Sequence, residues 1–293
     1  MQRTVSLTLA YVLFALACLG LFTLWLFPYE NFKAWLAEKA QAASGLNVSI
    51  TELGPAYLPP GFVLTGTTLA AKGANSPVLL QLPELKASLA LVPLLTAKLG
   101  AALSGSLYDG EITLTAASGA LFDFKTPELT VNLEDVRLDQ NPALSGLVGV
   151  QSLTGSLSGD LGLSREGDPG EFQGAGSIRA KDLAIGIALP FLRDNRLDLG
   201  SGEATFSVKG PVITLGECRL KSKTFEAELK GTITVLPGQK SVTFDLAGTW
   251  RIDPAAVDMA KLPSDSLREQ LRQRKQLPLR ITGQPGALQI MPI

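Results

Sequence analysis

Alternation of apolar and polar residues with a period of two is the strongest pattern along this chain. Between Thr224 and Val235 the two kinds of residue separate onto opposite sides of an extended strand. The apolar set is Phe225, Ala227, Leu229, Gly231, Ile233 and Val235, and the polar set is Thr224, Glu226, Glu228, Lys230, Thr232 and Thr234. A strand of this kind buries one face and leaves the other in water.

The same alternation recurs from Ser152 to Leu163 and in shorter runs on both sides of that segment. The shorter runs centre on residues 112–114, 129–133, 206–208, 242–246 and 279–281. Turn residues such as Asp109-Gly110 and Pro237-Gly238 separate the runs, which is typical of successive antiparallel hairpins. Glycines inside the strands mark bulges or bends. The pattern therefore predicts a mainly β protein with one long, curved antiparallel sheet and a few short helices.

The apolar side of this sheet has two interpretations. The residues that define it best are Phe225, Leu229, Ile233, Val242, Phe244 and Leu246. In a closed sandwich these side chains would be ordinary core, whereas in an open half-pipe they would line a groove able to hold acyl chains. The alternation does not distinguish the two, because it fixes only which residues share a face.

The N-terminus has a different pattern, since no charged residue occurs from Thr4 to Tyr29. A helix of that length can cross the roughly 30 Å hydrocarbon layer of a bilayer. We therefore expect a transmembrane anchor, represented by Val5, Leu13, Leu19, Leu26 and Phe27. Cleavage of a signal peptide after Ala40-Gln41-Ala42 is the main alternative, but the apolar run is too long for it. A lipoprotein attached at Cys18 is a weaker one, because the residues that follow stay apolar.

The anchor divides the chain into three segments. Residues 1–29 form a cytoplasmic tail and transmembrane helix, residues 30–45 form a membrane-proximal helix that Gly45 ends, and residues 46–293 form a periplasmic β-rich domain. Charge does not fix the orientation, because Lys33 and Lys39 are balanced by Glu30 and Glu38. Analogy with signal anchors places the large C-terminal part outside the cytoplasm, which predicts a single-pass inner-membrane protein.

Three helical interruptions of the sheet are expected, over residues 141–150, 189–197 and 254–274. The first has Pro142 at its first position, and the last has Asp253 as a natural N-cap and Pro263 as a break.

Composition removes several classes of function. Histidine is absent, 18% of residues are charged and the formal net charge is -1. The lack of histidine removes the commonest general base and metal ligand, and the balanced charge argues against nucleic-acid binding. We expect a protein that is not an enzyme and needs no cofactor or metal. Cys18 and Cys218 lie in different segments, so we expect free thiols.

Candidate chemistry is correspondingly sparse. The run Gly155–Gly159 fits a nucleophile elbow only if Leu157 is ignored, and it lies within an alternating strand. The carboxylates Glu134, Asp135 and Asp139 lack the spacing of a calcium loop. These three residues are better explained by a solvated strand end or turn.

One basic cluster stands out near the C-terminus. On a helix, Arg268, Arg272 and Lys275 would share one face. This face is either simply solvated or a contact for anionic lipid headgroups or an acidic partner.

Two stretches carry a family resemblance. The first is residues 43–53, Ala-Ser-Gly-Leu-Asn-Val-Ser-Ile-Thr-Glu-Leu, followed by Leu-Pro-Pro-Gly-Phe-Val-Leu-Thr-Gly at 58–66 and by Thr68-Leu69. The second is Leu-Val-Pro-Leu-Leu at 91–95 followed by the hairpin pattern of residues 105–114. Together they resemble the opening of the AsmA-like superfamily, in which an anchor helix leads into a strand, a proline-containing step and a second strand.

The overall architecture is similar to that of the protein N family of bacterial type II secretion systems. It has one N-terminal anchor, 293 residues and a final strand pair around residues 279–290. The resemblance implies a non-enzymatic, periplasm-facing inner-membrane component that acts in protein export by contacting other secretion-system envelope proteins. The wider AsmA-like resemblance implies an alternative, a protein that binds membrane lipid and carries it in an apolar groove between the membranes.

Overall fold

A computed structural model describes Tyr11, Phe14, Phe22 and thirteen further stretches of the chain. The stretches are residues 25–57, 59, 61–70, 78–90, 100–118, 127–141, 151–165, 171–187, 195–236, 241–261, 265–273, 276–284 and 287–292. The described strands form one 15-stranded antiparallel sheet, so the mainly β prediction is confirmed. Because the described strands form a single sheet, the fold is a half-pipe and not a two-sheet sandwich.

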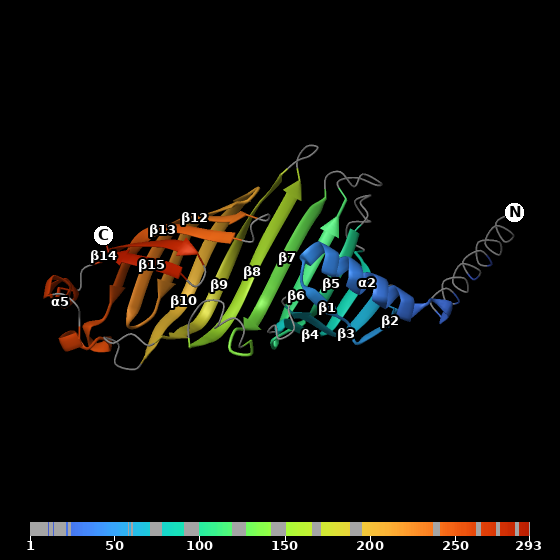
Figure 1. The fold of residues 1–293 in the computed structure, drawn as a ribbon, viewed down its shortest axis with the longest axis horizontal. Helices are drawn as coiled ribbons and strands as arrows, with labels where there is room; N and C mark the ends of the chain where they lie inside the picture. The colour runs from blue at the N-terminus through green and yellow to red at the C-terminus, as the bar shows by residue number, and fades with distance from the viewer. Residues whose placement is uncertain are drawn as a thin grey trace, which may run out of the picture.

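The strands follow the predicted runs closely. Their bounds are β1 Asn47–Ser49, β2 Glu52–Ala56, β3 Gly61–Ala70, β4 Val78–Leu89, β5 Gly100–Leu107, β6 Gly110–Ala117, β7 Glu128–Arg137, β8 Ser152–Arg165, β9 Phe172–Gly186, β10 Arg196–Lys209, β11 Val212–Lys221, β12 Phe225–Leu236, β13 Ser241–Ile252, β14 Leu277–Gln284 and β15 Ala287–Pro292. From β3 onward each strand pairs with the next one in the chain, whereas β1 and β2 both pair with β3 (Figure 1). The predicted hairpins are therefore the actual connections.

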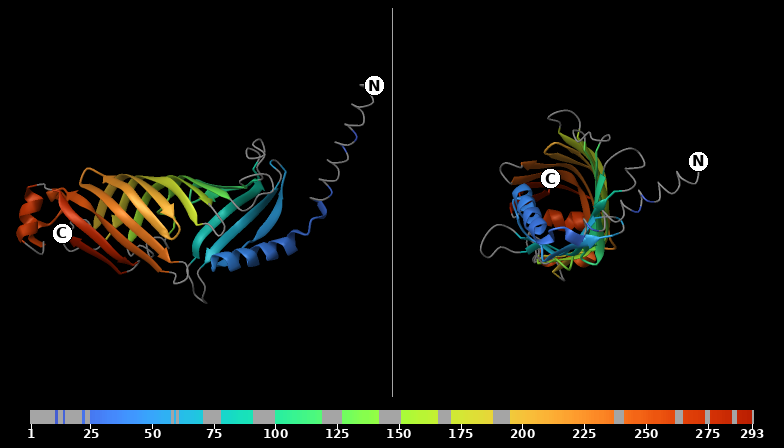
Figure 2. Two further views of the ribbon diagram at one scale, coloured as in Figure 1. Left: turned by 90° about the horizontal axis from the view of Figure 1, so that it is seen from above. Right: turned by 90° about the vertical axis from the view of Figure 1, so that its right-hand side faces the viewer.

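The sheet is strongly curved, and Figure 2 shows it curling around its long axis. Register shifts occur where glycines or aspartates take a positive φ, as at Asp135 between β7 and β8 and at Gly155 between β8 and β9. Gly200, with φ 66°, accompanies the shift between β9 and β10. Each bulge adds local twist and bends its strand. The prediction that interior glycines mark bends is confirmed at Gly155 and Gly200.

One predicted turn is displaced by a residue. The pair Leu107–Gly110 closes the β5–β6 hairpin, so Tyr108 and Asp109 are the central residues, both with positive φ. Gly110 already belongs to β6, where a Cβ atom would overlap the carbonyl oxygen of Glu134. Glycine is needed there for close strand packing rather than for the turn.

The helix α2 (Tyr29–Ser44) lies at the N-terminal end of the sheet and contacts β1 and β2. Gly45 ends it in the left-handed conformation, with φ 70° and a hydrogen bond from its N–H to the Gln41 carbonyl. The predicted stop is confirmed. Among the described residues, no helix has the length and apolar character needed to cross a membrane. Most of the anchor predicted over residues 4–29 lies outside the described residues.

The helix predicted over residues 254–274 is instead three short pieces, η1 (Pro254–Ala256), η2 (Met259–Lys261) and α5 (Asp265–Arg272). Asp253 is the predicted N-cap, and its Oδ1 accepts a hydrogen bond of 2.9 Å from the Ala255 N–H. Val257 and Leu271 are 1% and 2% exposed and pack with Ile252 and Leu277 of the sheet. These short helices therefore cover one end of the sheet.

The two other predicted helices, over residues 141–150 and 189–197, fall mostly outside the described residues. Residues 142–150 and 188–194 lie outside the described residues, while Asn141 has no helical conformation. Helix is wrong for residues 196–197, which begin β10 by pairing with Gly186 and Ile185 of β9. Cross-strand pairing overrides the local pattern there.

Close strand packing predicts a difference between two glycine substitutions. A Cβ atom at Gly248 would overlap the Glu228 carbonyl oxygen, whereas a Cβ at Gly162 meets nothing within 4 Å. Gly248→Ala should destabilise the fold by about 1–3 kcal/mol through overpacking. Gly162→Ala should be neutral or stabilising by up to about 1 kcal/mol, because alanine has less freedom to lose. Denaturant unfolding followed by circular dichroism measures both, and equal midpoints would contradict this account of the packing.

Candidate functional site

The apolar face of the sheet is the candidate site. Its six predicted residues all lie on one side of β12 and β13, because Ile233 pairs with Phe244 and Val235 with Val242. Leu229 faces Gly248, Gly231 faces Leu246, and Phe225 faces Ile252. Leu246 is buried and the other five are half-buried. The structure therefore brings the whole predicted set together.

A single row of apolar residues crosses the sheet from β2 to β14. Each member is the Cα partner of the next across a strand boundary, so all share this face. The row is Pro55, Phe62, Ala87, Leu103, Leu114, Val131, Leu161, Gly176, Phe206, Leu215, Gly231, Leu246 and Ile281. It contains no polar or charged residue. At about 4.8 Å per strand, the row is about 60 Å long.

Glycines on this face make room for large neighbours. A Cβ atom at Gly176 would lie 2.7 Å from the Phe206 ring, and one at Gly202 would lie 2.6 Å from the Leu220 side chain. These two large side chains therefore lie over glycine backbone, where any other residue would collide with them.

Only the ends of the apolar face are covered by described helices. At one end Phe32 of α2 contacts Phe62, with ring centroids 5.0 Å apart. At the other end Val257 and Leu271 pack against Ile252 and Leu277. Within the described parts of the chain, the strands from β5 to β11 contact chiefly their neighbours in the sheet. Figure 2 shows α2 on the concave side of the curl, and because α2 contacts Phe62 of the apolar face, this face is the concave one. The middle of the face has no described second layer.

The opposite face of the sheet is polar and carries ion pairs between neighbouring strands. These pairs are Lys181–Asp135 at 3.2 Å, Arg179–Glu203 at 3.4 Å, Arg219–Glu228 at 3.5 Å, Arg280–Asp245 at 3.1 Å and Arg251–Glu226. Apart from the half-buried Glu226, their side chains are largely exposed, so each pair adds little stability. The charged side chains pair with one another on this face, where they remain in contact with water, and none of these pairs lies on the apolar face.

The structure gives no catalytic role to the motif at Gly155–Gly159. These residues lie inside β8 without a strand-to-helix turn, and the Ser158 hydroxyl is hydrogen-bonded to the Asp135 carboxylate. The three carboxylates near it are also engaged. Glu134 accepts a hydrogen bond from Asn132, and Asp135 pairs with Lys181.

Asp139 makes two hydrogen bonds with the Arg137 guanidinium, at 3.2 and 2.7 Å. That contact lowers the pKa of the Asp139 carboxyl. Among the described residues no group of three or more side chains is arranged to hold a metal ion.

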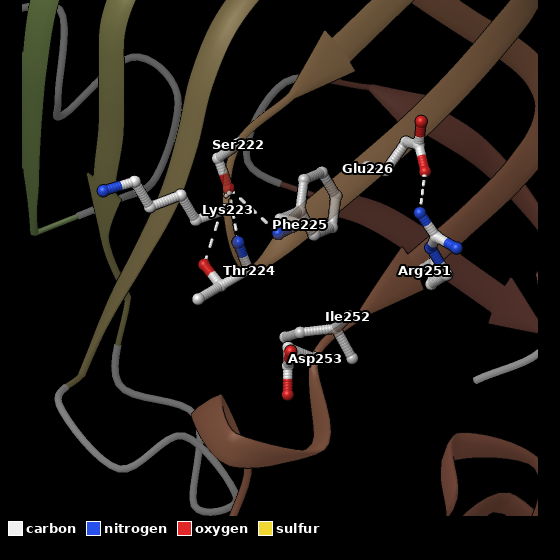
Figure 3. A pocket seen from close by; sticks show the side chains of 8 residues that line it. All are labelled: Ser222, Lys223, Thr224, Phe225, Glu226, Arg251, Ile252 and Asp253. Carbon is white, nitrogen blue, oxygen red and sulfur yellow. Dashed lines mark hydrogen bonds and ion pairs between the residues drawn. The ribbon is translucent and has the colours of Figure 1, made fainter. Parts of the chain in front are cut away.

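A small cavity of about 170 Å³ lies where the β11–β12 turn meets the end of β13 (Figure 3). The Ser222 hydroxyl accepts hydrogen bonds from the N–H groups of Thr224 and Phe225 and donates to the Asp198 carbonyl. Asp253 caps η1, and Arg251 pairs with Glu226. These polar groups hold the turn and the helix start in place, so the cavity has a structural explanation.

A larger hollow of about 590 Å³ lies on the polar face and is lined mainly by carboxylates and serines of β4 to β7. Lys86 pairs with Glu84 at 2.9 Å within it. The hollow is open to solvent, and its described carboxylates are not grouped to hold a metal ion.

The predicted basic cluster is only partly described. Arg268 pairs with Asp265 at 2.6 Å, and Arg272 is exposed in the last turn of α5. Lys275 lies outside the described residues. A headgroup or partner contact at this cluster stays a prediction.

Of the predicted anchor residues, Val5, Leu13 and Leu19 lie outside the described residues. Leu26 is 74% exposed, whereas Phe27 is half-buried against Phe62, with ring centroids 5.3 Å apart. Phe27 therefore packs on the β domain. The long apolar row, by contrast, could not be found from sequence, because only the strand registers reveal it.

The fold and its apolar face define a class, that of single-sheet β half-pipes preceded by a helix. Residues 1–103 of the 293 match the AsmA family, so this part of the chain is similar to AsmA-like proteins. Neither the curated proteins nor the solved structures contain a match. The closer resemblance to the secretion protein N family stays a prediction.

The thiol of Cys218 on the apolar face allows the burial of this face to be tested chemically. Cys218 is half-buried opposite Leu229, and burial raises the pKa of its thiol. In a Cys18→Ala background, the rate at which iodoacetamide alkylates Cys218 should therefore have a higher pH midpoint than in the denatured chain, because only the thiolate reacts. A cysteine placed at Glu217 with Cys218→Ala is the matched exposed control. Equal pH midpoints for Cys218 and this control would contradict the burial.

Proposed function

We propose that this protein binds the acyl chains of membrane lipids along its apolar face and carries them within the cell envelope. The uninterrupted apolar row from Pro55 to Ile281 is the observation that supports this most. A concave apolar face of this extent is unusual on a protein that binds nothing there, since exposed apolar area costs free energy in water.

The dimensions agree with lipid as the ligand. An acyl chain spans half of the roughly 30 Å hydrocarbon layer, about 15 Å, so a row of about 60 Å accommodates several chains end to end or side by side. The row offers no charge to a headgroup. Recognition would therefore rest on the acyl chain, with the headgroup left at the polar rim of the sheet.

The proposed location is the inner membrane, with the β domain in the periplasm. It is supported by the uncharged stretch Thr4–Tyr29 and by the match to the AsmA family, which is associated with the envelope. No catalytic step, cofactor or metal is part of the proposal.

Lipid binding is tested by placing a charge on each face of the same strand. Ile233 lies on the apolar face of β12 and its neighbour Thr232 lies on the polar face. Ile233→Lys should reduce the phospholipid that copurifies with the full-length protein at least several-fold, because the ammonium would be desolvated against the chains. Thr232→Lys should leave it unchanged. Native mass spectrometry counts the lipid, and circular dichroism confirms that both variants keep the sheet.

A lipid-free wild type, or equal lipid in both variants, would overturn the proposal. If Ile233→Lys fails to fold, Leu161→Gln provides a milder change on the same face in a different strand.

A second candidate function is docking of other secretion-system proteins, and the unequal edges of the sheet favour it. One edge is blunted, because β1 has 3 residues, β2 carries Pro55, and Lys33 of α2 bonds to the Thr51 carbonyl. At the other edge β15 is uncharged and, among the described strands, pairs only with β14. An edge of that kind can accept a strand from another protein.

Deletion of the gene distinguishes the two functions. A secretion component predicts a loss of export of folded periplasmic substrates, with an unchanged outer-membrane lipid content. A lipid carrier predicts normal export and an altered outer-membrane lipid content. Quantitative secretion assays and lipid analysis of isolated membranes measure the two outcomes.

A further inference from the structure

Exposed aromatic and apolar side chains occur just before α2, on α2 and directly after β2. Trp25 is 79% exposed, Leu26 74%, Trp35 51% and Tyr57 67%. We call these four residues the aromatic collar. Indole and phenol rings have an apolar body and a polar tip, and they are enriched where a bilayer meets water.

The collar is connected to the apolar row by a chain of ring contacts. Trp35 stacks on Phe32 with centroids 5.5 Å apart, and Phe32 contacts Phe62 at 5.0 Å. Phe62 is itself a member of the row, paired with Ala87 of β4. A continuous apolar path therefore runs from the exposed rings to the concave face.

The charges on α2 cancel, so the collar has no electrostatic preference for an anionic membrane surface. Glu30 pairs with Lys33 at 2.6 Å, and Glu38 is followed by Lys39. A surface without net charge gains nothing from anionic headgroups, in contrast to a polybasic segment. Its attraction to a membrane would come from ring burial alone.

We propose that the aromatic collar contacts the interface of a lipid bilayer, so that the apolar row begins at the membrane surface. The sequence favours a bilayer as the occupant, because the uncharged stretch Thr4–Tyr29 contains Trp25 and Leu26 and ends six residues before Trp35. Acyl chains would then pass along Trp35, Phe32 and Phe62 onto the sheet. This last step rests on the proposed lipid binding, whereas the bilayer contact does not.

The chain contains 3 tryptophans, which permits a direct test. In the full-length protein reconstituted in phosphatidylcholine vesicles, Trp25→Phe with Trp250→Phe leaves Trp35 as the reporter. Its fluorescence should be quenched at least twofold by lipids brominated close to the headgroup, and less by lipids brominated near the chain end. The matched control carries Thr232→Trp on the polar face, with all three native tryptophans replaced by phenylalanine, and should not be quenched.

Quenching of Trp35 by aqueous acrylamide but not by brominated lipid would overturn the proposal. A strong increase in quenching on adding anionic lipid would overturn it too, since a neutral collar has no preference for charge. Quenching in a protein that retains no lipid would support the bilayer contact and remove the proposed function. Retained lipid without quenching of Trp35 would overturn the bilayer contact and leave the proposed lipid binding intact.

Discussion

Strand register is the constraint on which the rest of this structure depends. Side chains alternate faces along a strand, so a slip of one residue would exchange the apolar and polar faces. The bulges respect this rule. Between β7 and β8 the pairing passes from Leu133–Gly159 to Val136–Leu157, which is three residues against two, and the apolar side is regained on both strands. Curvature is thus introduced without interrupting the apolar row.

A single curved sheet divides its two faces between different surroundings. Ion pairs such as Lys181–Asp135 and Arg179–Glu203 suit the polar face to water. The concave face gathers leucine, valine and phenylalanine side chains that remain half-buried in the middle of the sheet. In a sandwich a second sheet would remove them from water, and here no described element does so. An apolar ligand bound to the concave face would remove these side chains from water. Lipid therefore fits the geometry better than a polar substrate does.

The two ends of the apolar face differ in a way that suggests a direction. At the end of α2, exposed rings lead inward to Phe62 through aromatic contacts. At the other end, Val257 and Leu271 seal the face with the most completely buried side chains among the described residues. One end is therefore suited to contact a membrane, and the other is packed as protein core. Exchange of lipid with a second membrane or a partner would have to take place elsewhere along the sheet or by release of this seal.

The local sequence determined the strands, the identity of the two faces and even single helix boundaries, such as the end of α2 at Gly45 and the N-cap of η1 at Asp253. These features depend on neighbours within a few positions, where dihedral preferences and capping act. Only the tertiary structure decided three features: a single sheet instead of a sandwich, the row from Pro55 to Ile281 and the contact of Phe27 with Phe62. They depend on which strands pair and in what register, and those pairings join residues far apart in the chain. For the same reason residues 196–197 form a strand against β9 although their local pattern favours helix.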